Sequence, residues 1–351
     1  MIEGPVEVQP YRTFRFRVTL ARSWATPWHS DIIFGHLCWG KRYLDGDRAL
    51  TDWLGRCHDG KPPLVLSDGM PKDMLPRPLV PVTVPPDGPD RGSTLESQRQ
   101  VARLAKQSGK GRFLHRSGLA EACLGRPGMS SRSTSPHVSH QLKNQINRAT
   151  STTAGPDEPG QEGRGALFQV EEYQWSGVAG SPGDLFRRTV DIYARIARDC
   201  VDDTLQLFDW LREHGYGRRR SVGLGAIESI DVQPDDELDT LGGMTGTVRP
   251  TGFVSLSHFV PAVTDPMSGQ WRSIVKYGKV SEANGTTSSV FKFPIVFLQP
   301  GACFVVETGA VRPWYGRMVT NVHPTQSAIV QCGIAFALPI VAPSLLEPDP
   351  A

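Results

Sequence analysis

His214-Gly-Tyr-Gly-Arg-Arg-Arg-Ser-Val-Gly-Leu-Gly-Ala-Ile227 places four glycines around three consecutive arginines. Glycine adopts positive φ at little cost and lets a backbone approach another molecule closely. Successive exposed N–H groups in such a loop form a concave site for anions, and arginine has a fork geometry suited to phosphate. The stretch indicates a loop that binds a phosphodiester backbone. The residues assigned to this glycine–arginine loop are Gly217, Arg218, Arg219, Arg220, Ser221, Gly223 and Gly225.

Two other interpretations of this loop stay open. Its spacing matches neither the dinucleotide motif Gly-x-Gly-x-x-Gly nor a Walker loop, because no Gly-Lys-Ser/Thr follows, so a mononucleotide is the less favoured ligand. A glycine-rich connection between a helix and a strand, with solvated arginines, has the same composition. Phosphate binding and a plain connection therefore both stand at this point.

The chain of 351 residues has the length of two domains, or of three. Its 36 glycines and 29 prolines predict many loops. The net charge of +2 is unevenly placed, because ten Lys/Arg and a single acidic residue, Glu121, lie between Arg99 and Arg148. That segment carries +9 and leaves −7 for the remainder, out of the total of +2. Such asymmetry indicates a basic segment for nucleic acid or for an acidic partner.

The six cysteines are too widely spaced for a zinc knuckle or a CxxC redox site; they are Cys38, Cys57, Cys123, Cys200, Cys303 and Cys332. We expect reduced thiols in a cytoplasmic protein, with no metal and no cofactor. Glu3 and Glu7 lie in a terminus without an apolar stretch, so we expect no signal peptide. The longest apolar run is far below the ~20 residues of a membrane span.

Alternating apolar residues over Tyr11–Leu20 predict a half-buried strand with a basic outer face. Ser30 or Asp31 is expected to cap a helix that runs to about Tyr43. A catalytic role for Asp31 is the weaker alternative. Residues 64–66 suit a short strand, 67–69 a turn, and 74–78 an extended segment across a surface.

Residues 86–165 are expected to form a long, basic, mobile insertion with few large apolar side chains. Within it, residues 141–148 are rich in amides and basic groups. Composition favours a solvated loop, whereas the functional interpretation is a segment that faces nucleic acid, since amides and arginines contact phosphate, sugar and bases. Asn144, Asn147 and Arg148 are its candidate RNA-binding residues.

Further along, we expect a strand over 166–175, a half-buried strand over 190–196, a helix capped by Asp202 or Asp203 that ends near His214, and a strand over 226–232. This order suits a ferredoxin-like, RRM-type unit. A second, mostly β unit begins near residue 251. Its expected strands cover 253–260, 271–280, 295–299, 302–307 and 328–340, and Asn284-Gly285 is a hairpin signal.

Several motifs, taken in order, resemble one family. Ser30-Asp31-Ile32-Ile33-Phe34-Gly35 is similar to the Ser-Asp-x-x-Phe-Gly of RAMP proteins in CRISPR effectors. The other matching segments are 66–71, 75–78, Asn144 to Arg148 with Leu167-Phe168, 217–225 and Gly333-Ile334-Ala335-Phe336. Together they resemble the fourth-subunit family of the type III-A Csm complex, RAMP proteins of the Cas-five-like group. The departures are Arg218 to Arg220, which replace a usual Gly-Lys portion, and the long 86–165 insertion.

The resemblance implies an α+β protein with two ferredoxin-like (RRM-type) domains in tandem and a long basic insertion in the first. The expected ranges are 1–235, a linker over 236–250, a β-rich domain over 251–343 and a tail over 344–351. It also implies no catalytic centre, binding of the repeat-derived 5′ handle of crRNA, and contact with a large palm-polymerase-like subunit and a backbone RAMP subunit. It implies no contact with a membrane.

The alternative function is a RAMP endoribonuclease that processes pre-crRNA. Metal-independent RNA cleavage needs a general acid and a general base, usually His or Tyr near the scissile 2′-OH. The candidate residues are His29, His36, His137, His140 and His214. His36 lies within a helix pattern, which favours a packed core histidine, and His137 and His140 fall in the insertion, which favours solvated surface.

Overall fold

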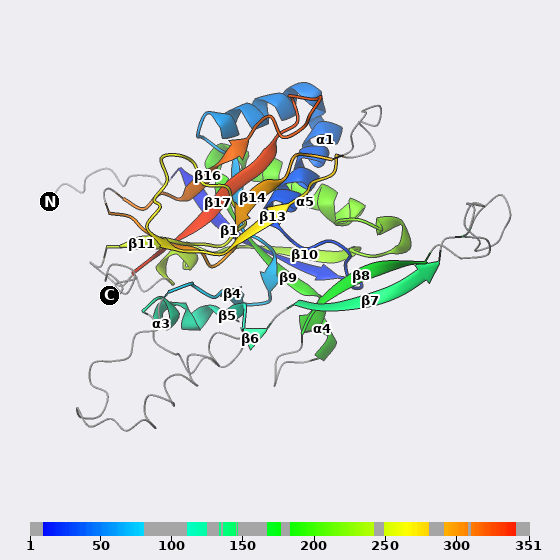
Figure 1. The fold of residues 1–351 in the computed structure, drawn as a ribbon, viewed down its shortest axis with the longest axis horizontal. Helices are drawn as coiled ribbons and strands as arrows, with labels where there is room; N and C mark the ends of the chain where they lie inside the picture. Colours follow the sequence, from blue (N-terminus) through cyan, green and yellow to red (C-terminus); the bar gives the residue numbers. More distant parts are fainter. Residues whose placement is uncertain are drawn as a thin grey trace, which may run out of the picture.

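The computed structural model describes residues 10–80, 111–124, 133–134, 136–144, 146, 167–176, 183–241, 249–280, 291–307 and 310–341. These residues form a mixed α/β protein with antiparallel sheets, two of them with five strands (Figure 1). One large apolar core contains residues from both halves of the chain, including Phe16 and Leu207 from the first half and Val254 and Phe336 from the second. The two halves therefore pack directly on each other.

The first sheet has the strand order β10-β1-β9-β2, with β3 paired to β9. Two helices connect its strands, so the elements follow one another as β1, α1, β2, β9, α5 and β10. This is the β-α-β-β-α-β order of ferredoxin-like units. The bounds are β1 Tyr11–Leu20, α1 Ser30–His58, β2 Leu64–Leu66, β3 Met70–Pro71, β9 Thr189–Ala197, α5 Val201–His214 and β10 Ile227–Pro234.

Helix α5 packs its apolar stripe on this sheet. The ring of Phe208 stacks on Phe16 of β1 with centroids 3.8 Å apart, and Leu207 and Leu211 are fully buried beside it. The predicted cap of α5, Asp202 or Asp203, was two or three residues late: both residues lie in the first turn, and Cys200 is the N-cap residue. Acidic groups in a first turn still favour the helix through its dipole.

Helix α1 is longer than predicted and is not capped as predicted. It continues past Tyr43 to His58 across a kink at Gly46, where φ is 89°. Its N-cap residue is His29, without a side-chain cap, whereas Ser30 and Asp31 lie buried in the first turn. The carboxylate of Asp31 instead accepts hydrogen bonds from Lys276 Nζ at 2.7 Å and from Gln331 Nε2 at 2.9 Å.

The face of β1 that the sequence assigned to solvent is covered. Arg17 donates through Nε to Asp191 Oδ1 at 2.8 Å and through Nη2 to Asp73 Oδ1 at 2.5 Å. The Asp73 N–H also donates to Asp191 Oδ2 at 2.8 Å. Asp73, which follows β3, and Asp191 of β9 thus partly enclose this face, and the side chains of Arg15 and Arg17 are 15% and 20% exposed. The prediction of a basic outer face was therefore wrong.

Strand β9 was predicted as half-buried, but all nine of its residues are buried. Arg195 explains how a charged side chain fits there. Its Nη1 donates to Ala337 O at 2.6 Å and also to the carbonyl oxygen of Pro313, and its guanidinium lies 4.3 Å from the centroid of Phe336. A residue of the first sheet thus satisfies carbonyls of the second half.

The second sheet has the order β12-β15-β11-β17-β16, and β13 and β14 form a separate pair. Gly316 interrupts the apolar pattern of β16, a strand absent from the prediction; its φ is 86°, and a Cβ there would lie 2.1 Å from Gly333 O. The described residues from 249 onward contain strands and no helix. The bounds are β11 Gly252–Ser255, β12 Gly269–Gln270, β13 Ser273–Lys276, β14 Ile295–Leu298, β15 Cys303–Val305, β16 Trp314–Val319 and β17 Gln331–Ile340. The Asn284-Gly285 signal lies outside the described residues.

The region predicted as a mobile insertion contributes regular elements. β7 Pro136–Asn144 pairs along its whole length with β8 Leu167–Trp175, and this hairpin extends away from the rest of the molecule (Figure 1). A small sheet joins β4 Met74–Pro76, β5 Phe113–His115 and β6 Ser133–Thr134. β4 is buried and does not cross a surface as expected.

The remaining elements are short: α3 Leu119–Cys123, α4 Gly183–Arg188, and 3₁₀ turns at Arg116–Gly118, Arg198–Cys200, Arg220–Val222 and Leu238–Thr240. Residues 67–69, expected to be a turn, connect β2 to β3 without a regular turn. No helix within the described ranges combines the length and apolar character that crossing a membrane requires.

The buried ion pairs of the first sheet should matter far more than exposed ones. We expect Asp191→Ala to lower the free energy of unfolding by about 3 kcal/mol, because it removes the fully buried partner of the mostly buried Arg17. Asp199→Ala is the matched control: Asp199 also pairs with an arginine, Arg56, but its side chain is 66% exposed. The control should lose about 0–1 kcal/mol. Urea unfolding of both variants measures this, and equal losses would contradict the prediction.

Candidate nucleic-acid interface

A cleft of about 1340 Å³ lies where the two halves of the chain meet. One wall comes from the first half, with the start of α1, the glycine–arginine loop and Glu171 and Tyr173 of β8. The other wall comes from β13, β14 and their neighbours in the second half. The lining includes Thr26, His29, Asp31, His36, Trp39, Tyr43, Glu171, Tyr173, His214, Gly217, Arg218, Arg220, Lys276, Tyr277, Lys279, Lys292 and Gln331.

The glycine–arginine loop follows α5 and has a tightly determined shape. Gly217, Gly223 and Gly225 all have φ between 69° and 83°, a region that L side chains rarely adopt. A Cβ at position 217 would lie 2.7 Å from Thr26, and a Cβ at position 225 would lie 2.0 Å from Tyr216 O. The fold itself therefore requires glycine at these two positions. Gly223 has no neighbour within 3.6 Å of such a Cβ, so only there is the backbone open to another molecule.

The N–H groups of the loop mostly donate within the protein. Gly217 N donates to His36 Nε2 at 3.1 Å, and Arg218 N donates to Thr26 Oγ1 at 3.0 Å. Gly223 N donates to Arg220 O at 2.9 Å, and Gly225 N donates to Ser23 O at 3.0 Å. These four N–H groups are therefore not available to form the predicted concave anion site. Its ligand-binding capacity lies in its side chains.

The three arginines point in different directions. Arg218 donates from Nε to Ala25 O at 2.6 Å, and its Nη2 lies 3.6 Å from a Glu171 carboxylate oxygen. Arg220 donates to His214 O at 3.1 Å and lines the cleft. The guanidinium of Arg219 lies 5.2 Å from the ring centroid of Phe168 on the hairpin. Arg218 and Arg220 are exposed, as is Ser221 next to them, so two of the three predicted arginines face the cleft.

The opposite wall adds cations that the sequence did not single out. Lys276 donates to Asp31 Oδ1 at 2.7 Å, and Lys292 donates to Gln331 Oε1 at 2.8 Å. Burial lowers the pKa of Lys292. Lys279 is exposed and lies 5.0 Å from the centroid of Phe291. Lys276 is separated from Asp31 by 245 residues, so no local pattern could have placed these lysines beside the glycine–arginine loop.

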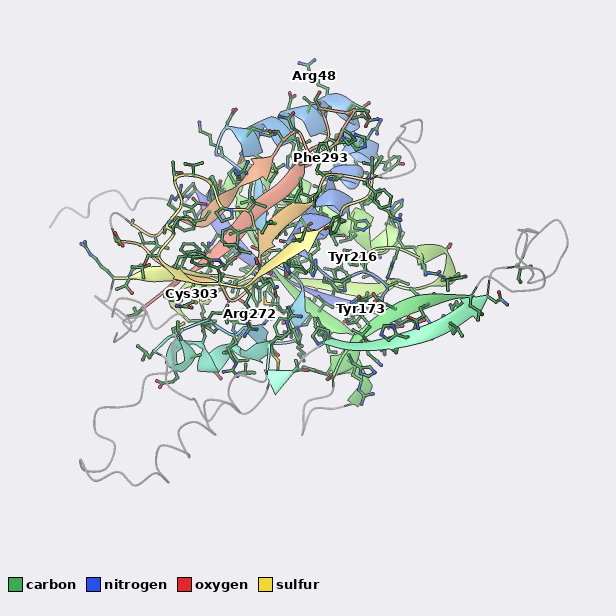
Figure 2. The ribbon with its side chains drawn as sticks, in the orientation of Figure 1. Arg48, Tyr173, Tyr216, Arg272, Phe293 and Cys303 are labelled. Carbon is green, nitrogen blue, oxygen red and sulfur yellow. The ribbon has the colours of Figure 1, made fainter. Side chains whose placement is uncertain are left out.

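Aromatic side chains alternate with these charges. Tyr43 and Tyr277 are 66% and 70% exposed, and Trp39 stacks near Tyr43 with centroids 5.8 Å apart. Tyr173 and Tyr216 (both labelled in Figure 2) are more enclosed. Burial and the hydrogen bond to Glu171 raise the pKa of Tyr173 to about 12, so its hydroxyl stays protonated and donates. Exposed rings beside cations are the features on which single-stranded nucleic acids stack and pair their phosphates.

Of the other predicted RNA-binding residues, the structure describes only Asn144, which is not part of the cleft lining. Asn144 is exposed at the end of β7, opposite Leu167. Asn147 and Arg148 lie outside the described residues. The histidine candidates divide in the same way: His29, His36 and His214 line the cleft, whereas His137 and His140 are exposed on β7.

No protein family model matches the sequence, and no curated protein does. The similarity is to solved structures. A chain of the Csm1–Csm4 cassette in complex with pppApA has 14% identity and a TM-score of 0.52, with 93% of this chain and 98% of that chain covered. The chain in the cassette in complex with cA4 has 13% identity and a TM-score of 0.53, at the same coverage. A chain of the Csm3–Csm4 subcomplex of the type III-A CRISPR–Cas interference complex has 12% identity and a TM-score of 0.51, with 94% of this chain and 99% of that chain covered.

The chain has the fold of Csm4. The resemblance suggested by the motifs is thereby confirmed at the level of the fold. Three of those motifs meet around one end of the cleft in this Csm4-like fold: Ser30 begins α1, Asp68 accepts a hydrogen bond from the Ser30 N–H at 2.9 Å, and Gly217 donates to His36 on the same helix. Motifs that are weak singly are therefore joined by direct contacts.

The histidine beneath the loop gives a pH-dependent prediction. Burial, together with Arg220, lowers the pKa of His36 to about 4. Between that value and its ordinary value of 6.5, the unfolded chain binds a proton that the folded chain does not, so stability falls as pH is lowered through this window. His36→Gln keeps an acceptor for the Gly217 N–H and should lose less stability than the wild type between pH 7 and pH 5. Urea unfolding at several pH values tests this, and parallel curves would refute it.

Proposed function

We propose that this chain is a non-catalytic, RNA-binding subunit of a type III CRISPR effector complex. In this proposal it holds the repeat-derived 5′ handle of the crRNA in the cleft between its two halves. It bridges a large, palm-polymerase-like subunit to a backbone RAMP subunit in antiviral defence. The proposal includes two ferredoxin-like units in tandem, the first with residues of about 86–165 as a basic insertion and the second consisting of strands without helices among its described residues.

The observation that carries the proposal is a two-walled cationic and aromatic cleft within a Csm4-like fold. Arg218 and Arg220 stand on one wall, and Lys276 and Lys279 stand on the other. Phosphate contacts supply most of the affinity for nucleic acid, and stacking on exposed rings supplies 1–3 kcal/mol per base. A single strand has its backbone and its bases free to use both features at once, whereas a mononucleotide would fill a small part of this volume.

The partners in the proposal are taken from the complexes in which the similar proteins were solved. Csm4 occurs with Csm1 in one set of structures and with Csm3 in another. This chain also exposes apolar side chains on its hairpin, with Leu142, Leu167 and Phe168 between 38% and 64% exposed. Exposed apolar groups gathered on one element are typical of a protein interface. They support a role in assembly for the hairpin.

Binding of a single-stranded RNA with the handle sequence should respond to salt through both walls of the cleft. For single strands, log K falls by about 0.7 per phosphate contact for each unit of log salt. The double variant Arg220→Ala/Lys279→Ala should therefore flatten the salt slope by roughly 1.4. Arg187→Ala is the control, since Arg187 is exposed on α4 and outside the cleft lining. Binding curves across a salt series measure the slopes; an unchanged slope in a folded double variant would place the RNA elsewhere.

The absence of catalysis is a separate prediction. Purified protein incubated with repeat RNA in EDTA should leave the RNA intact, because His36 already accepts a bond from Gly217 and His214 Nδ1 is 2.9 Å from Trp210 O. Cleavage by the wild type that is lost in His29→Ala would instead establish the endoribonuclease alternative. Denaturing gels of end-labelled RNA give the readout, with RNA alone as the control.

A further inference from the structure

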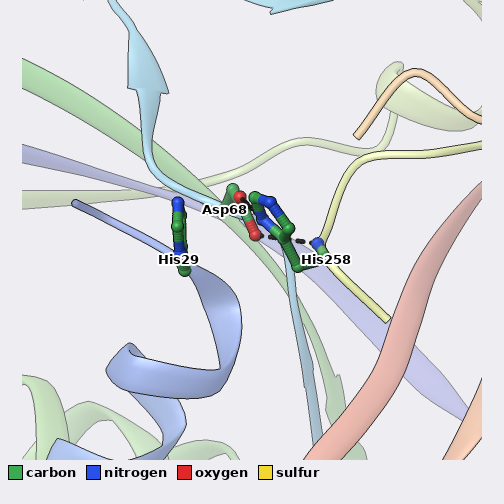
Figure 3. A group of neighbouring side chains, drawn as sticks. All are labelled: His29, Asp68 and His258. Carbon is green, nitrogen blue, oxygen red and sulfur yellow. Dashed lines mark hydrogen bonds and ion pairs between the residues drawn. The ribbon is translucent and has the colours of Figure 1, made fainter. Parts of the chain in front are cut away.

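Three side chains converge at a buried point next to the cleft, which only His29 of the three lines. His29 precedes α1, Asp68 lies between β2 and β3, and His258 follows β11. Each offers one nitrogen or oxygen atom, and these three atoms all lie within 4.8 Å of one another. Figure 3 shows the three side chains together, with Asp68 next to His258. The three residues are far apart in the sequence, so no short metal-binding motif contains them.

The three donor atoms are of the kinds that bind a divalent transition metal. Two imidazole nitrogens and one carboxylate oxygen are ligands that Zn²⁺ binds at about 2.0–2.2 Å in tetrahedral geometry, which spaces the ligand atoms roughly 3.3 Å apart. Asp68 Oδ2 and His258 Nδ1 are now 2.5 Å apart and are joined by one hydrogen-bonded proton. Replacement of that proton by a metal ion requires them to separate by less than about 1 Å, a change within the reach of side-chain rotation.

The carboxylate is already oriented for such a role. Its other oxygen, Oδ1, accepts hydrogen bonds from the Ser30 N–H at 2.9 Å and from the His258 N–H at 3.0 Å. These two bonds fix the plane of the carboxylate and leave Oδ2 toward the histidine rings. Hydrogen bonds that orient a ligand from behind are a regular part of metal sites.

His29 supplies the most specific observation. Its ring lies against that of His258, with centroids 4.1 Å apart, but among the residues that the structure describes it has no side-chain hydrogen-bond partner. It also lines the cleft. The nearest lysine, Lys276, is held by Asp31 at 2.7 Å, so its charge is balanced. An imidazole beside a carboxylate and a second imidazole, with access to solvent, has what is needed to complete a coordination shell.

We propose that His29, Asp68 and His258 bind one Zn²⁺ ion, with a water molecule from the cleft as the fourth ligand. The ion clasps the first half of the chain, through His29 and Asp68, to the second half, through His258. Its role is structural: it adds to the free energy that holds the two walls of the cleft together, since a ligand that binds only the folded state stabilises it. This site is independent of the RNA-binding proposal.

The test uses tag-free, full-length protein that has been treated with chelator and then dialysed against zinc. Elemental analysis should find one zinc per chain in the wild type and close to none in His29→Phe. Phenylalanine keeps a ring against His258 but offers no ligand atom. His140→Ala is the matched control, an exposed histidine on the hairpin, and should keep the wild-type zinc content. The melting temperature should rise with zinc in the wild type and in the control only.

Equal zinc in the wild type and in a folded His29→Phe variant would overturn the proposal, and so would a wild type without zinc. If the variant does not fold, cobalt titration of the wild type decides the matter. Saturable visible absorption at one Co²⁺ per chain, with the intensity of four-coordinate cobalt, supports the site. A titration without such bands refutes it.

Discussion

The buried carboxylate of Asp68 accepts the N–H of Ser30, the N–H of His258 and the His258 ring, while its own backbone N–H donates to Leu256 O at 3.0 Å. These four bonds tie the first turn of α1 and the β2–β3 connection to the segment after β11. A carboxylate removed from water costs several kcal/mol unless it is fully paired. The three segments are therefore constrained to meet at one point, and the cleft between the halves has its shape because they do.

The glycine–arginine loop is the second constraint on that cleft. Gly217 must pass within contact distance of Thr26, and Gly225 must pass that close to Tyr216, so the loop is pinned to the segment that leads into α1. Most of its N–H groups donate hydrogen bonds within the protein, whereas the side chains of Arg218 and Arg220 are exposed. The motif thus acts in two parts: the glycines position the loop, and Arg218 and Arg220 line the cleft.

Local patterns predicted the elements, and contacts distant in sequence decided the site. The alternation of apolar residues over 11–20 predicted β1, and the apolar stripe over 202–214 predicted α5. Both predictions succeeded because an element with one buried face has a regular apolar pattern in its own sequence. The basic face of β1 was misjudged because its partner, Asp191, is 174 residues away. Lys276 could not be assigned to the cleft for the same reason. Gly316 concealed β16, since a glycine with positive φ inside a strand looks like a break.

The position of the cleft links binding to the packing of the halves. In the proposed function, a strand of RNA that touches Arg220 on one wall and Lys279 on the other binds tightly only when the walls keep their spacing. Asp68 and Arg195 set that spacing, the first through His258 and the second through Ala337 O. By linkage, any ligand that contacts both walls stabilises the arrangement that these two residues hold. Weakening either residue should then lower RNA affinity without removing a phosphate contact, which distinguishes a cleft between packed halves from a site built on one half alone.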